Sequence, residues 1–420
     1  MLQQKRGSIV DDLIVQEAEM LKNELVDLRR TIHRNPELSF QEFQTKELVM
    51  NELKKIPGMQ IGQSENLETA VIATISNGEG PCIAVRADMD ALPILEEADH
   101  DYSSRVNGVM HACGHDAHTA IGLGVAKLIG KQMCAGLICG TVKFIFQPAE
   151  EAADSTGKTG AAYLVEEGIV ADVDAVVALH MCPEQEVGNI LIHDGYSMAN
   201  VDVFEATISG TGGHGAYPHL GTDPVWMLGP VMQAIHGVVA RQISPLEPAV
   251  ISIGEIRAGS ASNIIPSEVY LQGTLRSYDP KVREALIEKL HKAISIAETL
   301  GGEYTFQATK GEPALYNDKT INQILKQSVK TLYPGMNIID EPFGLGGEDF
   351  SHMTSKVPGA MFFLGCALAD HVKRELHTPI FDIDESCLPI GVAIISQTVY
   401  TLLTGKQTFF KKDGRLQGTI

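Results

Sequence analysis

The chain has little positive charge. Its 420 residues include 33 lysines and arginines against 53 aspartates and glutamates, a formal net charge of −20. Nucleic-acid binding requires a basic surface that neutralises phosphates, so we expect no nucleic-acid partner. The sequence also lacks internal repeats, low-complexity tracts and any apolar run close to the roughly 18 residues of a membrane span. With 44% apolar residues, the composition predicts a soluble globular protein without a membrane segment.

Cysteine is scarce and shows no framework spacing. The number is odd, and the seven residues are scattered at positions 82, 113, 134, 139, 182, 366 and 387. No signal-peptide pattern is present at Met1–Val10. Together these features predict a protein of the reducing cytoplasm, where a cysteine is more often a ligand or a core residue than half of a disulfide.

The first part of the chain alternates between helical and strand patterns. Apolar spacing predicts a helix over 11–34, and Ser39 with Glu42 has the form of a capping box for a second helix that reaches about Lys55. Four apolar runs then predict buried strands, with helical stretches such as Ala117–Ile129 between several of them: Ala70–Ile75, Cys82–Val85, Val142–Phe146 and Ala175–Leu179. Strands that alternate with helices predict an α/β fold with a largely parallel sheet.

Between about 197 and 309 the pattern changes to a period of two. Apolar and polar residues alternate over 204–209 and 269–276, as in an antiparallel sheet with one solvated face. The other face would be covered by a helix with one apolar stripe, made of Val282, Leu286, Leu290, Ala293 and Ala297. We therefore predict an inserted α+β domain at 197–309, which interrupts a larger domain formed by 1–196 and 310–420.

The segment His111–Ala120, HACGHDAHTA, places one thiol and three imidazoles within eight positions. Cysteine sulfur and histidine nitrogen are preferred ligands of zinc-like ions, and Cys113 and His115 can present both donors to one site. Any one of these residues alone would more often be a buried cysteine or a surface histidine. The cluster gains weight from donors further along the chain, in FQPAEE (146–151), ALH (178–180) and LHTP (376–379). This distribution indicates a metallohydrolase.

Several of these donors follow predicted strands. Asp88 and Asp90 come after the strand Cys82–Val85, Glu150 and Glu151 come after Val142–Phe146, and His180 closes Ala175–Leu179. In open α/β sheets, active sites lie beyond the carboxyl ends of the strands. We therefore expect three strands to deliver donors to the same edge of the sheet.

Hydrolysis at a metal centre needs ligands for the ion and a base for the attacking water. The adjacent Glu150 and Glu151 do not comfortably face one point, so we expect one to bind metal and the other to handle a proton. Five donors exceed the three protein ligands of a usual catalytic zinc and fit two ions that share a bridging water: Cys113, His115, Glu151, His180 and His377. Asp88 or Asp90 would orient a ligand imidazole from behind.

Other polar residues carry weaker signals. His111 is a further donor candidate, whereas Asp116 and His118 fall on the first turns of the next helix, where capping or packing is the commoner role. In the predicted inserted domain, the glycine-rich GTGGHGAYPH (210–219) would present His214 on a tight loop, although an incidental histidine in a hairpin turn is the more common case. Asn263 and Arg276 are suited to grip a carboxylate, and Arg276 is equally compatible with the solvated face of a strand.

With these residues laid out, the chain resembles the aminoacylase/carboxypeptidase-type metallopeptidases. The nearest branch contains hippurate hydrolases, N-acetyldiaminopimelate deacetylases and hydrolases of indole-acetyl amino-acid conjugates. The matching segments follow the family's order over nearly the whole chain: RADMDALP (86–93), HACGHDAHTA, GTVKFIFQPAEE (140–151), GGHGAYPH (212–219), GGEDFS (346–351) and LHTPIFDIDE (376–385). The chain departs from many relatives at Thr211, where they have lysine; this bears on lid contacts or specificity rather than on chemistry.

The resemblance implies a phosphorylase/hydrolase-like catalytic domain with a mixed, mostly parallel sheet, and an inserted α+β lid domain that also forms a homodimer. It implies that the five donors bind two divalent ions (zinc, manganese, cobalt or nickel) and that Glu150 is the general base. It further implies that His214 reaches the partner subunit's active site to stabilise the oxyanion, and that Asn263 and Arg276 hold the substrate's carboxylate.

The activity expected from the resemblance is hydrolysis of the amide of an N-acyl-L-amino acid, a small molecule, to a carboxylate and a free amino acid. Two alternatives remain. A dipeptidase or carboxypeptidase would use the same chemistry on a peptide bond. A metal-binding scaffold without catalysis would be expected to lack Glu150 or a ligand, and neither is missing.

Overall fold

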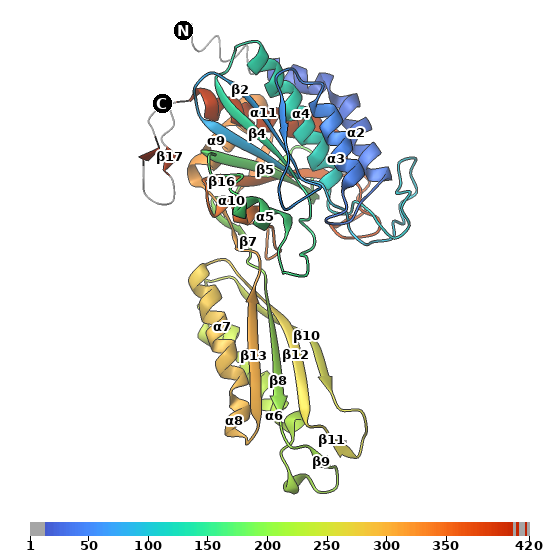
Figure 1. Ribbon diagram of the computed structural model, residues 1–420, viewed down its shortest axis with the longest axis vertical. Coiled ribbons are helices and arrows are strands. Elements are labelled where there is room, and N and C mark those ends of the chain that lie inside the picture. Colours follow the sequence, from blue (N-terminus) through green and yellow to red (C-terminus); the bar gives the residue numbers. More distant parts are fainter. Residues whose placement is uncertain (1–12, 406–408, 411–415, 418–420) are drawn as a thin grey trace. The chain divides into compact units, whose positions relative to one another are not determined.

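The computed structural model describes residues 13–405, 409–410 and 416–417, which form two compact units (Figure 1). The first unit contains the described residues up to Gly195, Tyr316–Phe343 and the described residues from Asp349 onward. The second contains Tyr196–Leu315 and Gly344–Glu348. That residues 197–309 form a domain of their own remains a prediction.

The first unit is built on an eight-stranded sheet with the order β1-β2-β4-β3-β5-β16-β6-β15. The pairs β3–β4, β3–β5, β5–β16 and β6–β15 are parallel, and the other three are antiparallel. The predicted mixed, mostly parallel sheet is therefore confirmed. In chain order the strands are β1 (Gln60–Gly62), β2 (Val71–Asn77), β3 (Cys82–Asp88), β4 (Gly140–Gln147), β5 (Ala175–Glu186), β6 (Asn189–Leu191), β15 (Asn337–Ile339) and β16 (Gly359–Ala367).

Helices cover this sheet. The long helices α4 (His115–Cys134) and α11 (Cys387–Thr404) contact each other and the central strands, and α2 (Lys22–Arg34) packs on both. Their apolar residues, with those of the strands, form one continuous core. The remaining helices are α3 (Phe43–Leu53), α5 (Gly160–Glu166), α9 (Lys319–Leu332) and α10 (Phe350–Thr354). Residues 13–20 are also helical, so the helix predicted over 11–34 is confirmed over its described part with a break at Leu21.

The helix α11 corrects one expectation. Its 18 residues have a mean hydropathy of 1.5 and pass a length and composition test for a membrane span, although no run of that kind was expected. Because 78% of these 18 residues are buried inside the fold, α11 has the surroundings of a core helix. Its serine, glutamine and threonine side chains interrupt the apolar pattern, which is why the run escapes notice in the sequence.

The capping box predicted for α3 is wrong. The hydroxyl of Ser39 donates to Asp90 instead of to the helix, and the first-turn amides of Gln44 and Thr45 donate to the carboxylate of Glu37 at 3.0 and 2.9 Å. Glu37 thus satisfies two of the amides that the start of a helix leaves without a backbone acceptor. Ser39 and Glu42 are available for other contacts.

The second unit has a four-stranded antiparallel sheet, β10-β12-β8-β13, as the period of two predicts. One face packs on the predicted helical stripe, now found on α7 (Pro280–Ile294) and α8 (Ile296–Thr299), and on α6 (Pro224–Gln242) (Figure 1). The strands are β8 (Asp202–Ser209), β10 (Ala249–Ala258), β12 (Glu268–Ser277) and β13 (Glu303–Lys310). A shorter pair of this unit is β9 (Gly213–His214) with β11 (Ile264–Ile265). Elsewhere in the described residues, β7 (Gly195–Met198) pairs with β14 (Leu315–Asn317), and β17 (Phe409–Phe410) pairs with β18 (Leu416–Gln417) in the first unit. A single 3-10 turn, η1, spans Pro218–Leu220.

Candidate metal centre

The HACGHD segment turns sharply into helix α4. Gly114 stands just before the helix with a left-handed φ of 91°, and a Cβ at this position would lie 2.8 Å from Cγ of Met181. Both the backbone conformation and the space therefore require glycine. The turn places Cys113 and His115, both buried, on the two sides of Gly114 at the end of the sheet.

The structure brings all five predicted donors together in two overlapping groups. Ligand atoms of Cys113, His115 and His180 lie within 4.8 Å of one another, and so do those of Cys113, Glu151 and His377. The Cys113 sulfur is 3.4 Å from Nε2 of His180, and Nε2 of His377 is 3.4 Å from Oε1 of Glu151. Since Cys113 belongs to both groups, these residues would hold two neighbouring cations.

His180 reaches this cluster from an unexpected place. The sequence predicted that it closes a strand, but β5 continues to Glu186 and His180 lies within it. Beyond Val177 the strand is no longer paired with β3, whereas its pairing with β16 continues, with His180 opposite Phe363. The separation from β3 opens the edge at which the donors meet.

Two buried polar atoms fit a bound cation. Within the described residues, neither Nε2 of His115 nor Oε1 of Glu151 has a hydrogen-bond partner, and the two atoms are 3.7 Å apart. Buried polar atoms without a partner are costly, and coordination would satisfy both. A donor set of thiol, imidazole and carboxylate suits zinc, manganese, cobalt or nickel better than magnesium or calcium.

The electrostatics of the cluster also match a cation. Burial, with Glu151 and Glu150 nearby, raises the pKa of Cys113 well above its usual value, so the thiol is neutral without an added positive charge. Burial opposes the charged form of His115, but Asp88, Asp90 and Glu151 together outweigh it and raise its pKa to about 10. The carboxylates thus create a negative site that a proton or a metal cation neutralises.

Of the two aspartates predicted to orient a ligand imidazole, Asp90 contacts the far ring nitrogen of the ligand candidate His115, whereas Asp88 contacts His118. Asp90 Oδ1 is 3.2 Å from Nδ1 of His115, which leaves Nε2 facing the cluster, and Asp90 Oδ2 accepts the amide of Glu151 at 2.9 Å. Asp88 is 2.6 Å from Nδ1 of His118. Carboxylates behind metal-binding histidines commonly fix the orientation of the ring.

His118 is occupied at both ring nitrogens. The amide of Met181 donates to its Nε2 at 2.9 Å, so Nδ1 carries the proton that is donated to Asp88. Although Asp88, His115 and His118 also lie within 4.8 Å of one another, His118 has no lone pair left for a metal. The carbonyl of Met181 in turn accepts from Nδ1 of His180 at 2.7 Å, which leaves Nε2 of His180 facing Cys113.

Backbone strain is found beside the predicted catalytic residues. Ala149, just before Glu150, has a φ of 54°, and His377 has a φ of 60°. Left-handed non-glycine residues persist where surrounding contacts hold them. Ala149 donates to Glu42 at 2.9 Å and accepts from Gly160 at 2.8 Å, and the amide of His377 donates to the carbonyl of Ala112 at 2.8 Å.

A buried ion-pair network beneath the cluster was missed in the sequence. The Arg29 side chain is fully buried and donates to Asp116, Asp382 and Glu385 at 3.0, 2.8 and 3.0 Å. It therefore ties the segment after His115 to the segment after His377. The available signal was a charged residue on the apolar stripe of a helix, next to Leu28. His111 remains outside the donor groups, and neither of its ring nitrogens has a partner among the described residues.

The other predicted site residues belong to the second unit. His214 is exposed on β9, and the amide of Ala216 donates to its Nδ1 at 3.0 Å, so Nε2 carries the proton and is a hydrogen-bond donor. Asn263 lies beside it, because its carbonyl accepts from the amide of Gly215 at 2.8 Å. His214 and Asn263 are thus on neighbouring segments of the second unit.

Arg276 lies at the other end of the same sheet. It pairs with Val250 near the end of β12, whereas β12 begins at Glu268, opposite Ser209 and close to the β9–β11 pair. Arg276 is eight steps along the strand from Glu268, a distance of about 27 Å. Asn263 and Arg276 of one chain therefore do not meet at a single carboxylate.

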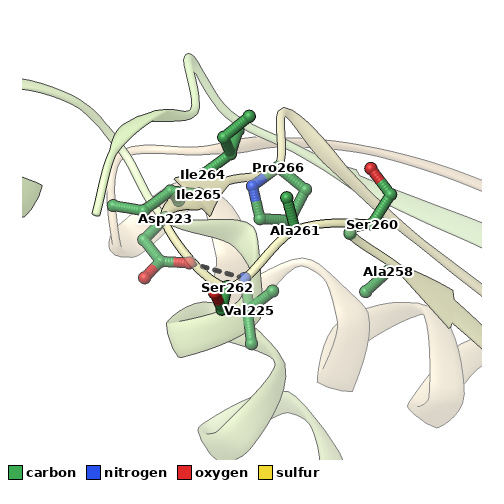
Figure 2. Close-up of a pocket in the computed structure, with 10 residues that line it drawn as sticks. Asp223, Val225, Ala258, Ser260, Ala261, Ser262, Ile264, Ile265 and Pro266 are labelled. Carbon is green, nitrogen blue, oxygen red and sulfur yellow. Dashed lines mark hydrogen bonds between the residues drawn. The ribbon is translucent and has the colours of Figure 1, made fainter.

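A surface pocket of the second unit lies over the loop between β10 and β12. It is lined by Ala258–Ser262, Ile264–Pro266, Asp223 and Val225 (Figure 2). The Asp223 carboxylate in this pocket caps α6 by accepting the amides of Val225 and Trp226 at 2.9 and 3.1 Å. The Asp223 carboxylate of this pocket is therefore engaged in capping the helix.

Comparisons with known proteins agree with this geometry. Residues 84–401 match the sequence model of peptidase family M20/M25/M40. The chain is 36% identical to N-acetylcysteine deacetylase of Bacillus subtilis over 90% of this chain and 97% of that protein, and 37% identical to thermostable carboxypeptidase 2 of Saccharolobus solfataricus over 89% and 95%. It also resembles the crystal structure of B. subtilis YXEP, described as a dinuclear metal-binding peptidase, with a TM-score of 0.80, 32% identity and coverage of 92% and 99%.

These matches confirm the resemblance drawn from the motifs, and with it the predicted metal-dependent hydrolase with two divalent ions. The family model spans most of the chain, including every predicted donor and both glutamates at 150 and 151. The chain belongs to peptidase family M20/M25/M40.

Proposed function

We propose that the chain is a metal-dependent amidohydrolase that cleaves the amide of N-acyl-L-amino acids to a carboxylate and a free amino acid. The observation that carries this proposal is the convergence of the five donors beside Glu150, whose Oε2 is 3.9 Å from Nε2 of His115. The similarity to N-acetylcysteine deacetylase, which by its name removes an acetyl group from an amino acid, supports the substrate class.

In this proposal Cys113, His115, Glu151, His180 and His377 hold the two ions. Bound there, the ions supply Lewis-acid polarisation of the acyl carbonyl and a water of lowered pKa. Glu150 accepts a proton from the attacking water, whose oxygen adds to the carbonyl carbon. When the C–N bond breaks, Glu150 returns that proton to the leaving nitrogen, so atoms and charge balance.

We also propose that the second unit is the inserted lid and that it completes the site in a homodimer. Within one chain, His214 and Asn263 lie near the start of β12, whereas Arg276 lies about 27 Å along that strand from its first residue, Glu268. If all three act on one small substrate, His214 and Asn263 of the partner subunit would join Arg276 of the first. His214 would then stabilise the oxyanion through its Nε2 proton, and Asn263 with Arg276 would hold the carboxylate.

The cellular setting belongs to the same proposal. All seven cysteines are free thiols in the structure. Scattered free thiols fit a reducing compartment, and we place the protein in the cytoplasm.

A peptidase is the second candidate. The similarity to a thermostable carboxypeptidase is as strong as that to the deacetylase, and the same residues would hydrolyse a peptide bond. A scaffold without catalysis is disfavoured because the donors and Glu150 are all gathered at one place.

The deciding experiment is release of free amino acid from N-acetyl, N-benzoyl and indole-acetyl amino acids and from dipeptides. Protein reconstituted with zinc, manganese, cobalt or nickel would be compared with a chelated sample. Chelator-sensitive turnover of acyl-amino acids supports the proposal and identifies the acyl group. Turnover of dipeptides alone favours the peptidase, and no turnover with two ions bound favours the scaffold.

A further inference from the structure

The residues first interpreted as a capping box lie against the metal centre instead. Ser39 and Glu42 precede helix α3, in a short loop that also contains Phe40, whose φ of 66° is left-handed. The first-turn amides of the helix are already bound by Glu37. The side chains of Ser39 and Glu42 therefore contribute nothing to the start of the helix, and each contacts a different segment of the site.

Glu42 holds the backbone that leads into Glu150. It is fully buried; its Oε1 accepts the amide of Ala149 at 2.9 Å and that of Phe40 at 3.0 Å, and its Oε2 accepts the hydroxyl of Thr69 at 2.8 Å. Ala149 is the left-handed residue at the end of the loop before the two glutamates. Its amide is thus bound by Glu42.

The carbonyl of Ala149 is held from the other side. Gly160 donates to it at 2.8 Å, and a Cβ on Gly160 would lie 1.8 Å from the carbonyl oxygen of Pro148. The backbone amide and the backbone carbonyl of the strained Ala149 are therefore both held by hydrogen bonds. Strain of this kind persists only where neighbours over-determine it, and the conformation of Ala149 sets the direction in which Glu150 and Glu151 leave the strand.

Ser39 acts on the other side of the cluster. Its hydroxyl donates to Oδ2 of Asp90 at 2.6 Å, and the same oxygen accepts the amide of Glu151 at 2.9 Å. The second oxygen of Asp90 faces Nδ1 of His115 at 3.2 Å. Ser39 thus fixes the rotation of the Asp90 carboxylate, which orients the ring of His115 and the backbone of Glu151.

We propose that Ser39 and Glu42 are positioning residues of the metal centre: Ser39 orients His115 and Glu151 through Asp90, and Glu42 aims Glu150 and Glu151 through the left-handed Ala149. This inference rests on the proposed function for the meaning of Glu150, but the arrangement of the ligands can be tested without turnover. Loss of hydrogen bonds behind metal ligands typically costs 10–100-fold in metal affinity or activity.

The variants are Ser39→Ala and Glu42→Ala, with Ser39→Thr and Glu42→Gln as conservative partners. Threonine keeps the hydroxyl, and glutamine keeps an acceptor for the two amides. The matched control is Glu37→Ala in the same loop, which removes the acceptor of the α3 amides and touches neither Asp90 nor Ala149. Each protein is loaded with cobalt. We then record the visible spectrum of the bound ion, the affinity for cobalt, and kcat and KM on the best substrate among the acyl-amino acids and dipeptides proposed above.

For Ser39→Ala we expect an altered cobalt spectrum and a cobalt affinity or kcat lowered about 10–100-fold, with a smaller change in KM. Ser39→Thr should restore most of the loss. Glu42→Ala should lower kcat in the same range and Glu42→Gln should restore it. Glu37→Ala should lower the thermal midpoint while leaving the spectrum and kcat unchanged.

The inference is overturned if Ser39→Ala and Glu42→Ala resemble Glu37→Ala, with lower stability but unchanged spectrum, affinity and kcat. If Glu42→Ala does not fold, the Ser39 pair decides the matter. A wild-type protein that binds cobalt but turns over no substrate contradicts the proposed function alone, because the spectrum and the affinity still report whether Ser39 and Glu42 position the ligands.

Discussion

Arg29 Nε donates to Asp116 Oδ2 at 3.0 Å, and neither side chain is exposed to solvent. Asp116 follows the ligand candidate His115, and the same guanidinium reaches Asp382 and Glu385, which follow His377 in the sequence. One buried cation therefore joins the two chain segments that carry ligands from opposite ends of the protein. Burial opposes the charge of Asp116, but Arg29 and His33 hold its pKa well below its usual value.

Replacing Arg29 with methionine should lower the free energy of unfolding by about 3–5 kcal/mol, because it leaves buried carboxylates without their partner. Urea titration of metal-free protein would measure the loss. Lys131→Met is the control: Lys131 forms a 2.6 Å pair with Glu17 on the surface of α4, 68% exposed, and its loss should cost about 1 kcal/mol or less. Equal effects of the two substitutions would show that the Arg29 network contributes no more than a surface pair.

Glu150→Gln should reduce kcat by about 10²–10⁴-fold, since glutamine keeps the size of the side chain but accepts no proton. The metal content should stay unchanged, because Glu150 is outside the five proposed ligands. Stopped assays on the best acyl-amino acid or dipeptide substrate would measure kcat, and elemental analysis would measure the metal content. Glu166→Gln, an exposed partner of Lys158, is the control. A Glu150→Gln variant of near-normal rate would remove Glu150 from the mechanism.

Cys113 belongs to both donor groups, whereas His180 and His377 each belong to one. Cys113→Ala should therefore bind fewer ions per chain than either His180→Ala or His377→Ala. Elemental analysis after reconstitution and dialysis measures the ratio, and the exposed Cys134→Ala controls for general effects of losing a thiol. Retention of two ions by Cys113→Ala would argue against a shared sulfur ligand.

The dimer proposal predicts complementation between inactive variants. Glu150→Gln damages the site of its own chain, and His214→Ala would damage the site of the other. In an equal mixture that exchanges subunits, half of the dimers are mixed and each of these has one intact site, so activity should recover to about a quarter of the wild-type value. No recovery after exchange would mean that His214 acts within its own chain or is not needed.

Glu42 should make stability depend on pH. Burial, and then the neighbouring Asp90, raise the pKa of Glu42 from its ordinary 4.5 to about 8, against the hydrogen bonds from Thr69 and Ala149, which lower it. Between these values the folded protein holds a proton that the unfolded chain has lost. The contribution of Glu42 to the free energy of unfolding is therefore complete below about pH 4.5 and falls as the pH rises to about 8.

Urea unfolding of metal-free protein at several pH values across this window, compared with Glu42→Gln, measures that dependence. Glutamine carries no proton to lose, so the difference in unfolding free energy between wild type and variant should change steadily with pH. Metal-free protein is needed because metal binding is itself pH-dependent. A difference that stays constant over the window would mean that Glu42 titrates normally in the folded protein.

Much of the site could be predicted because its chemistry is local in the sequence. Cys113 and His115 are two positions apart, and Glu150 and Glu151 follow a strand whose apolar run is plain. The positions of the strands that carry these donors followed from apolar runs, and parallel strands bring their ends to one edge. His180 was placed at a strand end because an apolar run shows where burial begins but not where pairing stops.

The errors have a common physical cause. Ser39 and Glu42 have the spacing of a capping box, and the same spacing serves equally well for two contacts with Asp90 and Ala149, which lie 51 and 107 positions away. His111 and His118 look alike in HACGHDAHTA, yet only His118 finds partners at both ring nitrogens, in Asp88 and Met181. Local spacing carries no information about such distant partners.

The amino-acid sequence by itself determined the family, the kind of metal site and the alternation of strands and helices in the first part of the chain, because ligand types and hydrophobic periods are written in neighbouring residues. The tertiary structure alone decided that Arg29 joins the two ligand-bearing segments, that Glu42 holds the strained Ala149, and that Asn263 and Arg276 lie at opposite ends of one sheet. Those relations depend on which side chains packing brings into contact, and packing is a property of the whole folded chain.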